Sequence, residues 1–238
     1  MDAKPADDTL IKNSLFYTVM KTTDILYVFK KKDRLFTENL ECCKGIKVYN
    51  ENLVKYNGRE FRSWNPYRSK LAAAILKGLK IEIKSNSKIL YLGAATGTTV
   101  SHISDIVKEG IIYSVENSPV AVKKLIKLSE KRKNIIPILE DANHPDRYSS
   151  LVSCVDLIYQ DISQRNQAGI FISNVNKFLK KNGKGILMVK ARSIDVSLDP
   201  KDAYNLVSLE LKENGLKIEN KIDLAPYEKD HAVIIISN

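Results

Sequence analysis

A turn of small residues follows a short apolar run in the first half of the chain. The run Ile89-Leu90-Tyr91-Leu92 leads into Gly93-Ala94-Ala95-Thr96-Gly97-Thr98-Thr99. Small residues let a ligand approach the backbone, and free amides at a helix start hold anionic or polar groups. A dinucleotide fingerprint would place glycines at 93, 95 and 98, but two of these positions hold Ala and Thr. The turn indicates a nucleotide-like ligand; a tight strand-to-helix turn without a ligand is the alternative.

Acidic residues follow the next two strand patterns. Glu116 ends the run Tyr113-Ser114-Val115, and a carboxylate at that place accepts hydrogen bonds from both hydroxyls of a ribose. Asp141-Ala142 follows the run 135–139 and is suited to the amino group of adenine. A solvated carboxylate at a strand end is the alternative for Glu116. The turn and Glu116 together predict an adenosine-type cofactor.

Two charged residues end two further strand patterns. Asp161 follows the run 156–160, and Lys190 closes the apolar run 185–189. Because parallel strands end at one edge of a sheet, we expect Asp161 and Lys190 to form a charged pair able to tune a proton transfer. A lysine that simply extends into water from an apolar strand is the alternative for Lys190.

The elements that would position these residues alternate between strands and helices. Asn65-Pro66 predicts a helix start, with the helix over 67–79 and Gly78 near its end. Strands are expected at 88–92, 110–116, 135–139, 155–160 and 183–191, helices at 99–107, 120–132, 168–179 and 200–214, and two consecutive strands at 216–224 and 231–236. This order predicts an α/β domain over residues 61–238, with a mostly parallel sheet covered on both faces and an antiparallel pair at its end.

The first 60 residues have a different pattern. Short β-rich runs occupy 15–19, 25–29, 46–49 and 53–56, and Asn57-Gly58 is a turn signal. They predict a small antiparallel β domain over residues 1–60.

Composition restricts the function classes. The chain has 238 residues, of which 44% are apolar, so one α/β domain and a small accessory domain fit its length. The apolar runs are too short for a membrane helix and no secretory signal is visible, so we expect a cytoplasmic protein. Cys42, Cys43 and Cys154 form no disulfide framework, and the three histidines have no metal-ligand spacing. A net charge of +10 favours polyanions, most commonly nucleic acid.

Four segments together are similar to the fibrillarin family in its archaeal form, without the Gly/Arg-rich tail of the eukaryotic form. They are Asn65-Pro66-Tyr67-Arg68-Ser69-Lys70-Leu71-Ala72-Ala73, the turn 93–99, Tyr159-Gln160-Asp161-Ile162-Ser163-Gln164 and Tyr227-Glu228-Lys229-Asp230-His231-Ala232. The resemblance implies a Rossmann-like class I methyltransferase domain that uses S-adenosyl-L-methionine. It implies 2′-O-methylation of ribose in rRNA, and in archaea in tRNA, within a box C/D particle. The implied partners are a guide RNA, a Nop-family scaffold protein and a kink-turn-binding L7Ae-like protein.

The resemblance also implies roles for single residues. The catalytic set is similar to Lys70, Asp161, Lys190 and His231, with Lys190 as a candidate base, Asp161 orienting it or contacting the sulfonium, and Lys70 and His231 steering the hydroxyl and phosphate. The implied cofactor contacts are Gly93, Ala94, Ala95, Thr98, Thr99, Glu116, Asn117, Asp141, Ala142, Asp161, Ile162, Ser163 and Gln164. One departure concerns Asn117, where the family usually has an aromatic residue that covers the adenine face. Val120 also replaces a usual Arg.

Two other functions are compatible with parts of the pattern. An NAD-dependent oxidoreductase would share the strand–turn–helix unit, but the poor glycine fingerprint and the net charge argue against it. An assembly protein that has lost catalysis would share the resemblance, but it would not need to keep both Asp161 and Lys190.

Overall fold

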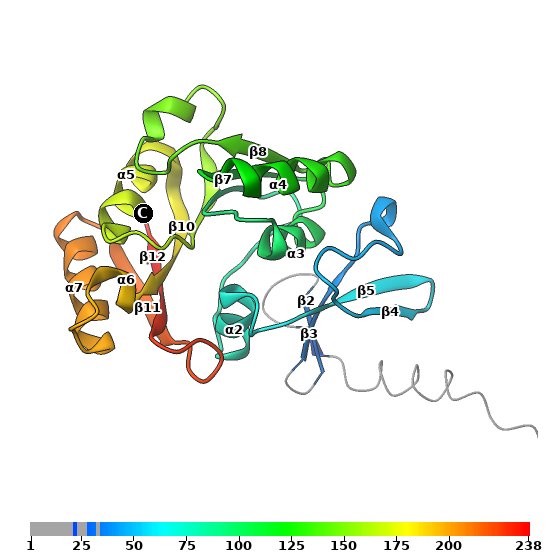
Figure 1. Cartoon of the computed structure of the whole chain (residues 1–238), viewed down its shortest axis with the longest axis horizontal. Coiled ribbons are helices and arrows are strands. Elements are labelled where there is room, and N and C mark those ends of the chain that lie inside the picture. The colour runs from blue at the N-terminus through cyan, green and yellow to red at the C-terminus, as the bar shows by residue number, and fades with distance from the viewer. Residues whose placement is uncertain (1–20, 23–27, 32–33) are drawn as a thin grey trace, which may run out of the picture.

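The computed structural model describes residues 21–22, 28–31 and 34–238 (Figure 1). The strand predicted at 15–19 and most of the one predicted at 25–29 lie outside the described residues. Within these ranges, no helix is long and apolar enough to cross a membrane.

The larger domain is built on a seven-stranded sheet with the order β11-β12-β10-β9-β6-β7-β8. The strands are β6 (Lys88–Leu92), β7 (Ile111–Glu116), β8 (Ile135–Leu139), β9 (Val155–Gln160), β10 (Leu179–Lys190), β11 (Lys217–Asp223) and β12 (His231–Ser237). Strands β6 to β10 pair in parallel, whereas β12 is antiparallel to both β10 and β11. The predicted parallel sheet with an antiparallel pair at its end is therefore confirmed.

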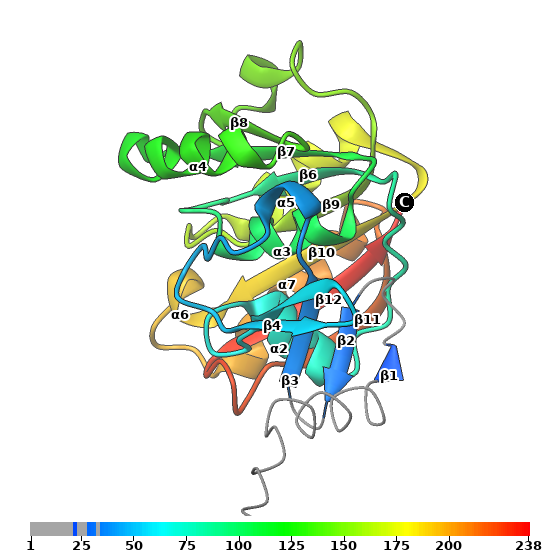
Figure 2. The same ribbon diagram turned by 90° about the vertical axis from the view of Figure 1, so that its right-hand side faces the viewer.

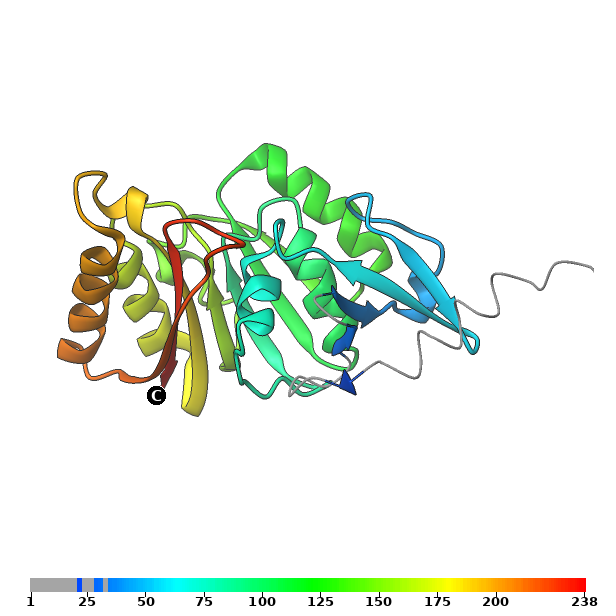
Figure 3. The same cartoon turned by 90° about the horizontal axis from the view of Figure 1, so that it is seen from below.

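Helices cover both faces of this sheet. They are α2 (Lys70–Leu76), α3 (Thr98–Ile106), α4 (Pro119–Lys131), α5 (Gln167–Phe178), α6 (Ala191–Ile194) and α7 (Pro200–Glu213), with a 3₁₀ turn η2 (Pro145–Tyr148). Residues alternate along β6, so that Ile89 and Tyr91 join one buried cluster with α2 and α3, while Leu90 and Leu92 join a second with α5 and α7. Figure 3 shows α7 (orange) on one side of the sheet and α4 (green) on the other.

The N-terminal part forms a five-stranded antiparallel sheet with the order β1-β2-β3-β5-β4, which lies against the larger domain near α3 (Figure 2). Its strands are β1 (Lys21–Thr22), β2 (Val28–Lys31), β3 (Arg34–Glu38), β4 (Leu53–Tyr56) and β5 (Arg59–Trp64), with a 3₁₀ turn η1 (Glu41–Cys43) after β3. Asn57 and Gly58 turn the chain between β4 and β5 with positive φ angles of 43° and 75°. The division at residue 60 stays a prediction, although β5 continues the small sheet to Trp64.

Two local predictions are wrong. Residues 46–49 form no strand, because Val48 and Tyr49 donate their backbone amides to the Glu51 carboxylate and bend the chain. The helix predicted over 67–79 is shorter, because Asn65 accepts from the Tyr67 amide at 2.9 Å and holds a turn instead of a helix start. Ser69 is the residue that caps α2.

A buried polar network joins the small sheet to α3. The Arg62 guanidinium from β5 contacts Glu51 at 2.6 Å and Asp105 at 2.8 Å, and Arg132 contacts the other oxygen of Asp105 at 2.5 Å. All four side chains are at most 1% exposed. Because each buried charge has an opposite partner, the network tolerates full burial.

His102 lies inside the same interface and is fully buried. Its Nδ1 contacts the Thr37 hydroxyl at 2.7 Å, its Nε2 contacts the Tyr49 hydroxyl at 2.6 Å, and its ring stacks on Trp64. A neutral imidazole has one donor and one acceptor nitrogen, so both contacts can be satisfied without a charge. Burial, together with the charges of Arg62 and Arg132, holds the pKa of His102 well below its ordinary value of 6.5.

This burial predicts a pH-dependent stability. The unfolded state binds a proton near pH 6.5 whereas the folded state resists it, so the free energy of unfolding falls as the pH is lowered from about 7 to 5. The slope contributed by one proton is at most about 1.4 kcal/mol per pH unit. Urea unfolding at several pH values measures it, and the His102→Gln variant should give a flatter profile. Equal slopes for both proteins would contradict the assignment.

Candidate active site

A cavity of about 340 Å³ opens at the carboxyl ends of β6, β7, β8 and β9. Most of the predicted cofactor positions line it, and the sequence did not point to Val115 and Glu140, which line it as well. The full lining comprises Gly93, Ala95, Val115, Glu116, Asn117, Glu140, Asp141, Ala142, Asp161, Ile162, Ser163 and Gln164. Strand ends at the edge of a parallel sheet are the usual place for a ligand in such folds.

Gly93 lets two loops approach each other at the floor of this cavity. Its φ is +84°, and a Cβ atom there would lie 2.3 Å from the carbonyl oxygen of Asp161. The Asp161 amide donates to the Leu92 carbonyl at 2.9 Å, which fixes the two strand ends together. Only glycine fits this position without a shift of the backbone.

Two carboxylates on the cavity wall are held by backbone amides. Glu116 accepts from the amides of Ala95 at 2.8 Å and Ser118 at 2.9 Å. Asp141 accepts from the backbone amide and the side chain of Asn143, and the backbone hydrogen bond lowers the pKa of Asp141. The Asn143 side chain also donates to Gln164 at 2.5 Å, so a residue that the sequence reasoning missed sets the positions of two others.

Three predicted cofactor positions do not line the cavity. Ala94 is buried, Thr98 opens α3, and the Thr99 hydroxyl donates to Ser69 at 2.9 Å. Because Ser69 also caps α2, this contact joins the turn at the cavity to the helix that begins with Lys70.

Asp161 forms its ion pair with Lys70 and not with Lys190. The Lys70 amine lies 2.9 and 3.0 Å from the two Asp161 oxygens, and both side chains are about one-fifth exposed. The Lys190 amine instead contacts the Ser163 hydroxyl at 3.4 Å. The expected Asp161–Lys190 pair was wrong because α2, which precedes β6 in the chain, brings a lysine to the end of β9. A partly exposed ion pair of this kind stabilises a fold only slightly, so its main effect is to position both groups.

Lys190 and His231 are neighbours at the same edge of the sheet. They are opposite residues in the antiparallel pair β10–β12. Gln167 holds the backbone of Lys190 with two hydrogen bonds, which sequence reasoning missed. His231 Nδ1 lies 2.6 Å from the Lys229 carbonyl oxygen, which can only accept, so Nδ1 carries a proton and the Nε2 of a neutral ring keeps its lone pair.

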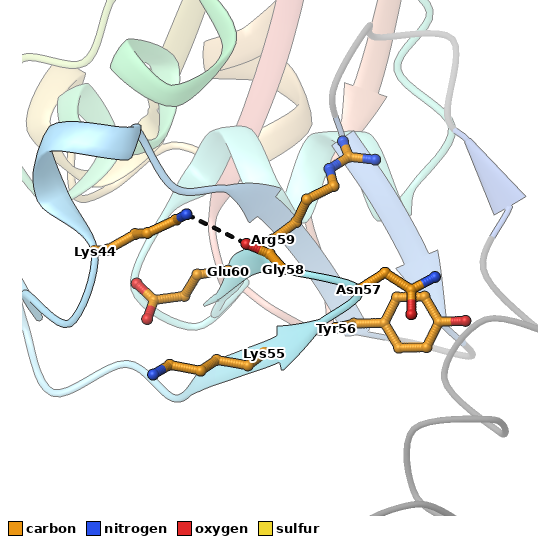
Figure 4. A pocket seen from close by; sticks show the side chains of 7 residues that line it. All are labelled: Lys44, Lys55, Tyr56, Asn57, Gly58, Arg59 and Glu60. Carbon is orange, nitrogen blue, oxygen red and sulfur yellow. Dashed lines mark hydrogen bonds between the residues drawn. The ribbon is translucent and has the colours of Figure 1, made fainter.

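A second cavity, of about 440 Å³, lies on the small sheet around the turn between β4 and β5 (Figure 4). It contains none of the predicted site residues. Lys44 crosses it and donates to the Gly58 carbonyl at 3.2 Å. The predicted residues therefore gather at the edge of the large sheet and not here.

Comparison with known proteins shows which family the chain matches. The fibrillarin family model matches residues 18–238. The chain is 51% identical over 205 residues to the fibrillarin-like rRNA/tRNA 2′-O-methyltransferase of Sulfolobus acidocaldarius, covering 85% of this chain and 88% of that protein.

Two solved structures are similar over most of the chain. Aeropyrum pernix fibrillarin with natively bound S-adenosyl-L-methionine matches with a TM-score of 0.78 and 44% identity, over 88% of this chain and 92% of that one. A fibrillarin/Nop5p complex matches with a TM-score of 0.83 and 45% identity, over 90% of this chain and 99% of that one.

The floor of the cavity gives a test with a matched control. Gly93→Ala and Gly215→Ala both place a side chain at positive φ, which costs roughly 1–2 kcal/mol. At Gly215 no atom lies within 4 Å of the new Cβ, whereas at Gly93 the Asp161 oxygen must move. Chemical unfolding should therefore show a further loss of about 1–3 kcal/mol for Gly93→Ala. Equal losses in the two variants would contradict the close approach.

Proposed function

The chain belongs to the fibrillarin family, and we propose that it transfers the methyl group of S-adenosyl-L-methionine to ribose 2′-hydroxyls of rRNA and tRNA. It acts in this proposal as the catalytic subunit of a box C/D guide RNA–protein particle. The observation that carries the proposal is the cavity beside a lysine–aspartate pair, in a chain about half identical to a 2′-O-methyltransferase over most of its length.

The cavity suits the cofactor. S-adenosyl-L-methionine supplies a methyl group already activated by its positively charged sulfur. The Glu116 carboxylate is fixed at a place suited to ribose hydroxyls, and Asp141, with its lowered pKa, stays an acceptor for an amino group. Gly93 lets the backbone of Asp161 approach closely at the floor of the cavity. Asn117 is exposed on the wall, so the usual aromatic cover is absent at this position.

The predicted catalytic residues bind the acceptor ribose in this proposal. A ribose hydroxyl is a weak nucleophile at neutral pH, so the protein must align it with the methyl group and accept its proton. We assign Lys70 and Asp161 to alignment, because each fixes the other at the cavity edge. Lys190 and His231 are the two candidates for the proton, and the contact of His231 Nδ1 with the Lys229 carbonyl leaves Nε2 as the ring nitrogen suited to accept it.

Target choice would come from partners. A Nop-family scaffold protein is supported by the similar fibrillarin/Nop5p complex. We propose that a kink-turn-binding protein and a guide RNA complete the particle, and that base pairing by the guide selects the nucleotide. The net charge of +10 supports contact with RNA but carries no sequence information.

Transfer of a labelled methyl group to RNA tests the function. We expect label at one ribose 2′-oxygen when the Nop-family protein, the kink-turn-binding protein and a guide RNA are present. Omitting the guide, or replacing the target ribose with 2′-deoxyribose, should abolish site-specific labelling. Site-specific methylation by the chain alone would contradict guidance, and label on a base would contradict the reaction.

Lys190 should affect the rate of methyl transfer and not the binding of the cofactor. It does not line the cavity, so Lys190→Ala should leave the dissociation constant of S-adenosyl-L-methionine unchanged. Loss of a proton-handling group lowers kcat by about 10²–10⁴-fold. Single-turnover methylation measures the rate, calorimetry measures the cofactor, and Lys201→Ala on the exposed side of α7 is the control. A wild-type rate in Lys190→Ala would remove this lysine from the site.

A further inference from the structure

An exposed tyrosine, which takes no part in the core, lies near the residues proposed to bind the acceptor ribose. Tyr67 is 64% exposed, the highest fraction among the large aromatic side chains of the described residues. Its ring meets Tyr227 edge to face, with the ring centres 5.4 Å apart. Tyr227 is partly buried and packs on the core cluster that contains α2, so it gives the exposed ring a fixed support.

The pair lies where two site-bearing segments meet. Tyr67 precedes Lys70 on the way into α2, and Tyr227 belongs to the connection between β11 and β12 that ends at His231. Figure 1 shows this connection (red) beside α2, and the Lys77 amine ties them by donating to the Ala225 carbonyl at 2.8 Å. The two tyrosines therefore lie on the side of the site from which the acceptor RNA must approach.

Arg68, the next residue, is held by Tyr49 and still has donors available. Its guanidinium lies 5.4 Å from the centre of the Tyr49 ring, and its Nη1 donates to the Tyr49 carbonyl at 3.3 Å. Tyr49 is itself held by His102 and by the Ser63 carbonyl. The guanidinium is exposed and has five N–H groups, so most of them remain available for a phosphate.

We propose that Tyr67, Arg68 and Tyr227 form an RNA-binding rim that holds the sugar and phosphate of a nucleotide adjacent to the methylated one. This inference rests on the proposed function. In an A-form helix the 2′-hydroxyls lie in the wide, shallow minor groove, so an enzyme that reaches one of them from a guide–target duplex must also meet its neighbours. A flat ring packs on a ribose, and the guanidinium pairs with the phosphate that follows. A protein partner would also cover an exposed aromatic ring, but the anchored guanidinium favours RNA.

RNA affinity and kinetics in the assembled particle test the rim. Tyr67→Ala should raise the KM for an RNA oligomer complementary to the guide about tenfold, with kcat and the affinity for S-adenosyl-L-methionine unchanged. Tyr67→Phe keeps the ring and should behave like the wild type. Arg68→Gln should weaken RNA binding and reduce the slope of log Kd against log salt concentration by about one.

Matched controls lie on α7, on the far side of the sheet. Leu209→Ala removes a side chain that is 54% exposed, and Lys201→Gln removes an exposed charge. Neither should change RNA binding. Thermal unfolding of the free chain shows whether each variant folds.

Two results would overturn the rim. One is RNA affinity in Tyr67→Ala and Arg68→Gln that equals that of the α7 controls. The other is weaker binding of the Nop-family protein in Tyr67→Ala, with unchanged RNA binding once that protein is saturating. RNA affinity is also measured with S-adenosylhomocysteine, where no transfer occurs. A wild-type particle that binds RNA but transfers no methyl group would therefore refute the proposed function. The RNA affinities of the variants would still test the RNA-binding rim.

Discussion

The buried carboxylate of Asp105 is the contact on which the arrangement of the two sheets depends. It accepts from Arg62 of the small sheet and from Arg132, which follows α4, while Glu51 contacts the other side of Arg62. The charges of two positive and two negative groups thus compensate each other in the protein interior, away from water. Loss of one partner would leave a buried charge uncompensated, which costs about 3–5 kcal/mol. Because Arg62 lies on β5, the same contact fixes the strand from which the chain proceeds to Lys70.

The site combines two groups of residues from different elements of the larger domain. The turn after β6 and the ends of β7, β8 and β9 form the cavity, whereas α2, β10 and β12 bring the charged side chains beside it. Ser69 joins them, since its hydroxyl caps α2 and accepts from Thr99 at the start of α3. The Lys70–Asp161 ion pair joins them again at the edge of the cavity. Both contacts act over short distances, so small shifts in either group would change the alignment of the two substrates.

Most of the large sheet could be predicted from the sequence, because β6 to β9 are apolar runs bounded by turn residues and the site residues follow their ends. Strand β3 was missed, and so was β5, where the charged residues Glu60 and Arg62 are buried with partners from distant segments. The Lys70–Asp161 pair was missed because only the fold brings α2 to the end of β9. Gln167 and Asn143 support the site through side-chain hydrogen bonds, which leave no periodic pattern in the chain.

The antiparallel direction of β12 has a consequence for the entropy of substrate binding. A parallel strand would need a crossover of a dozen or more residues, whereas β11 and β12 are joined by residues 224–230 alone. The Leu224 carbonyl accepts from the amides of Tyr227 and Glu228, and Arg192 pairs with Asp230 at the other end. The segment therefore has little conformational freedom left to lose. A surface that is already rigid loses less conformational entropy when a long, flexible polymer binds to it.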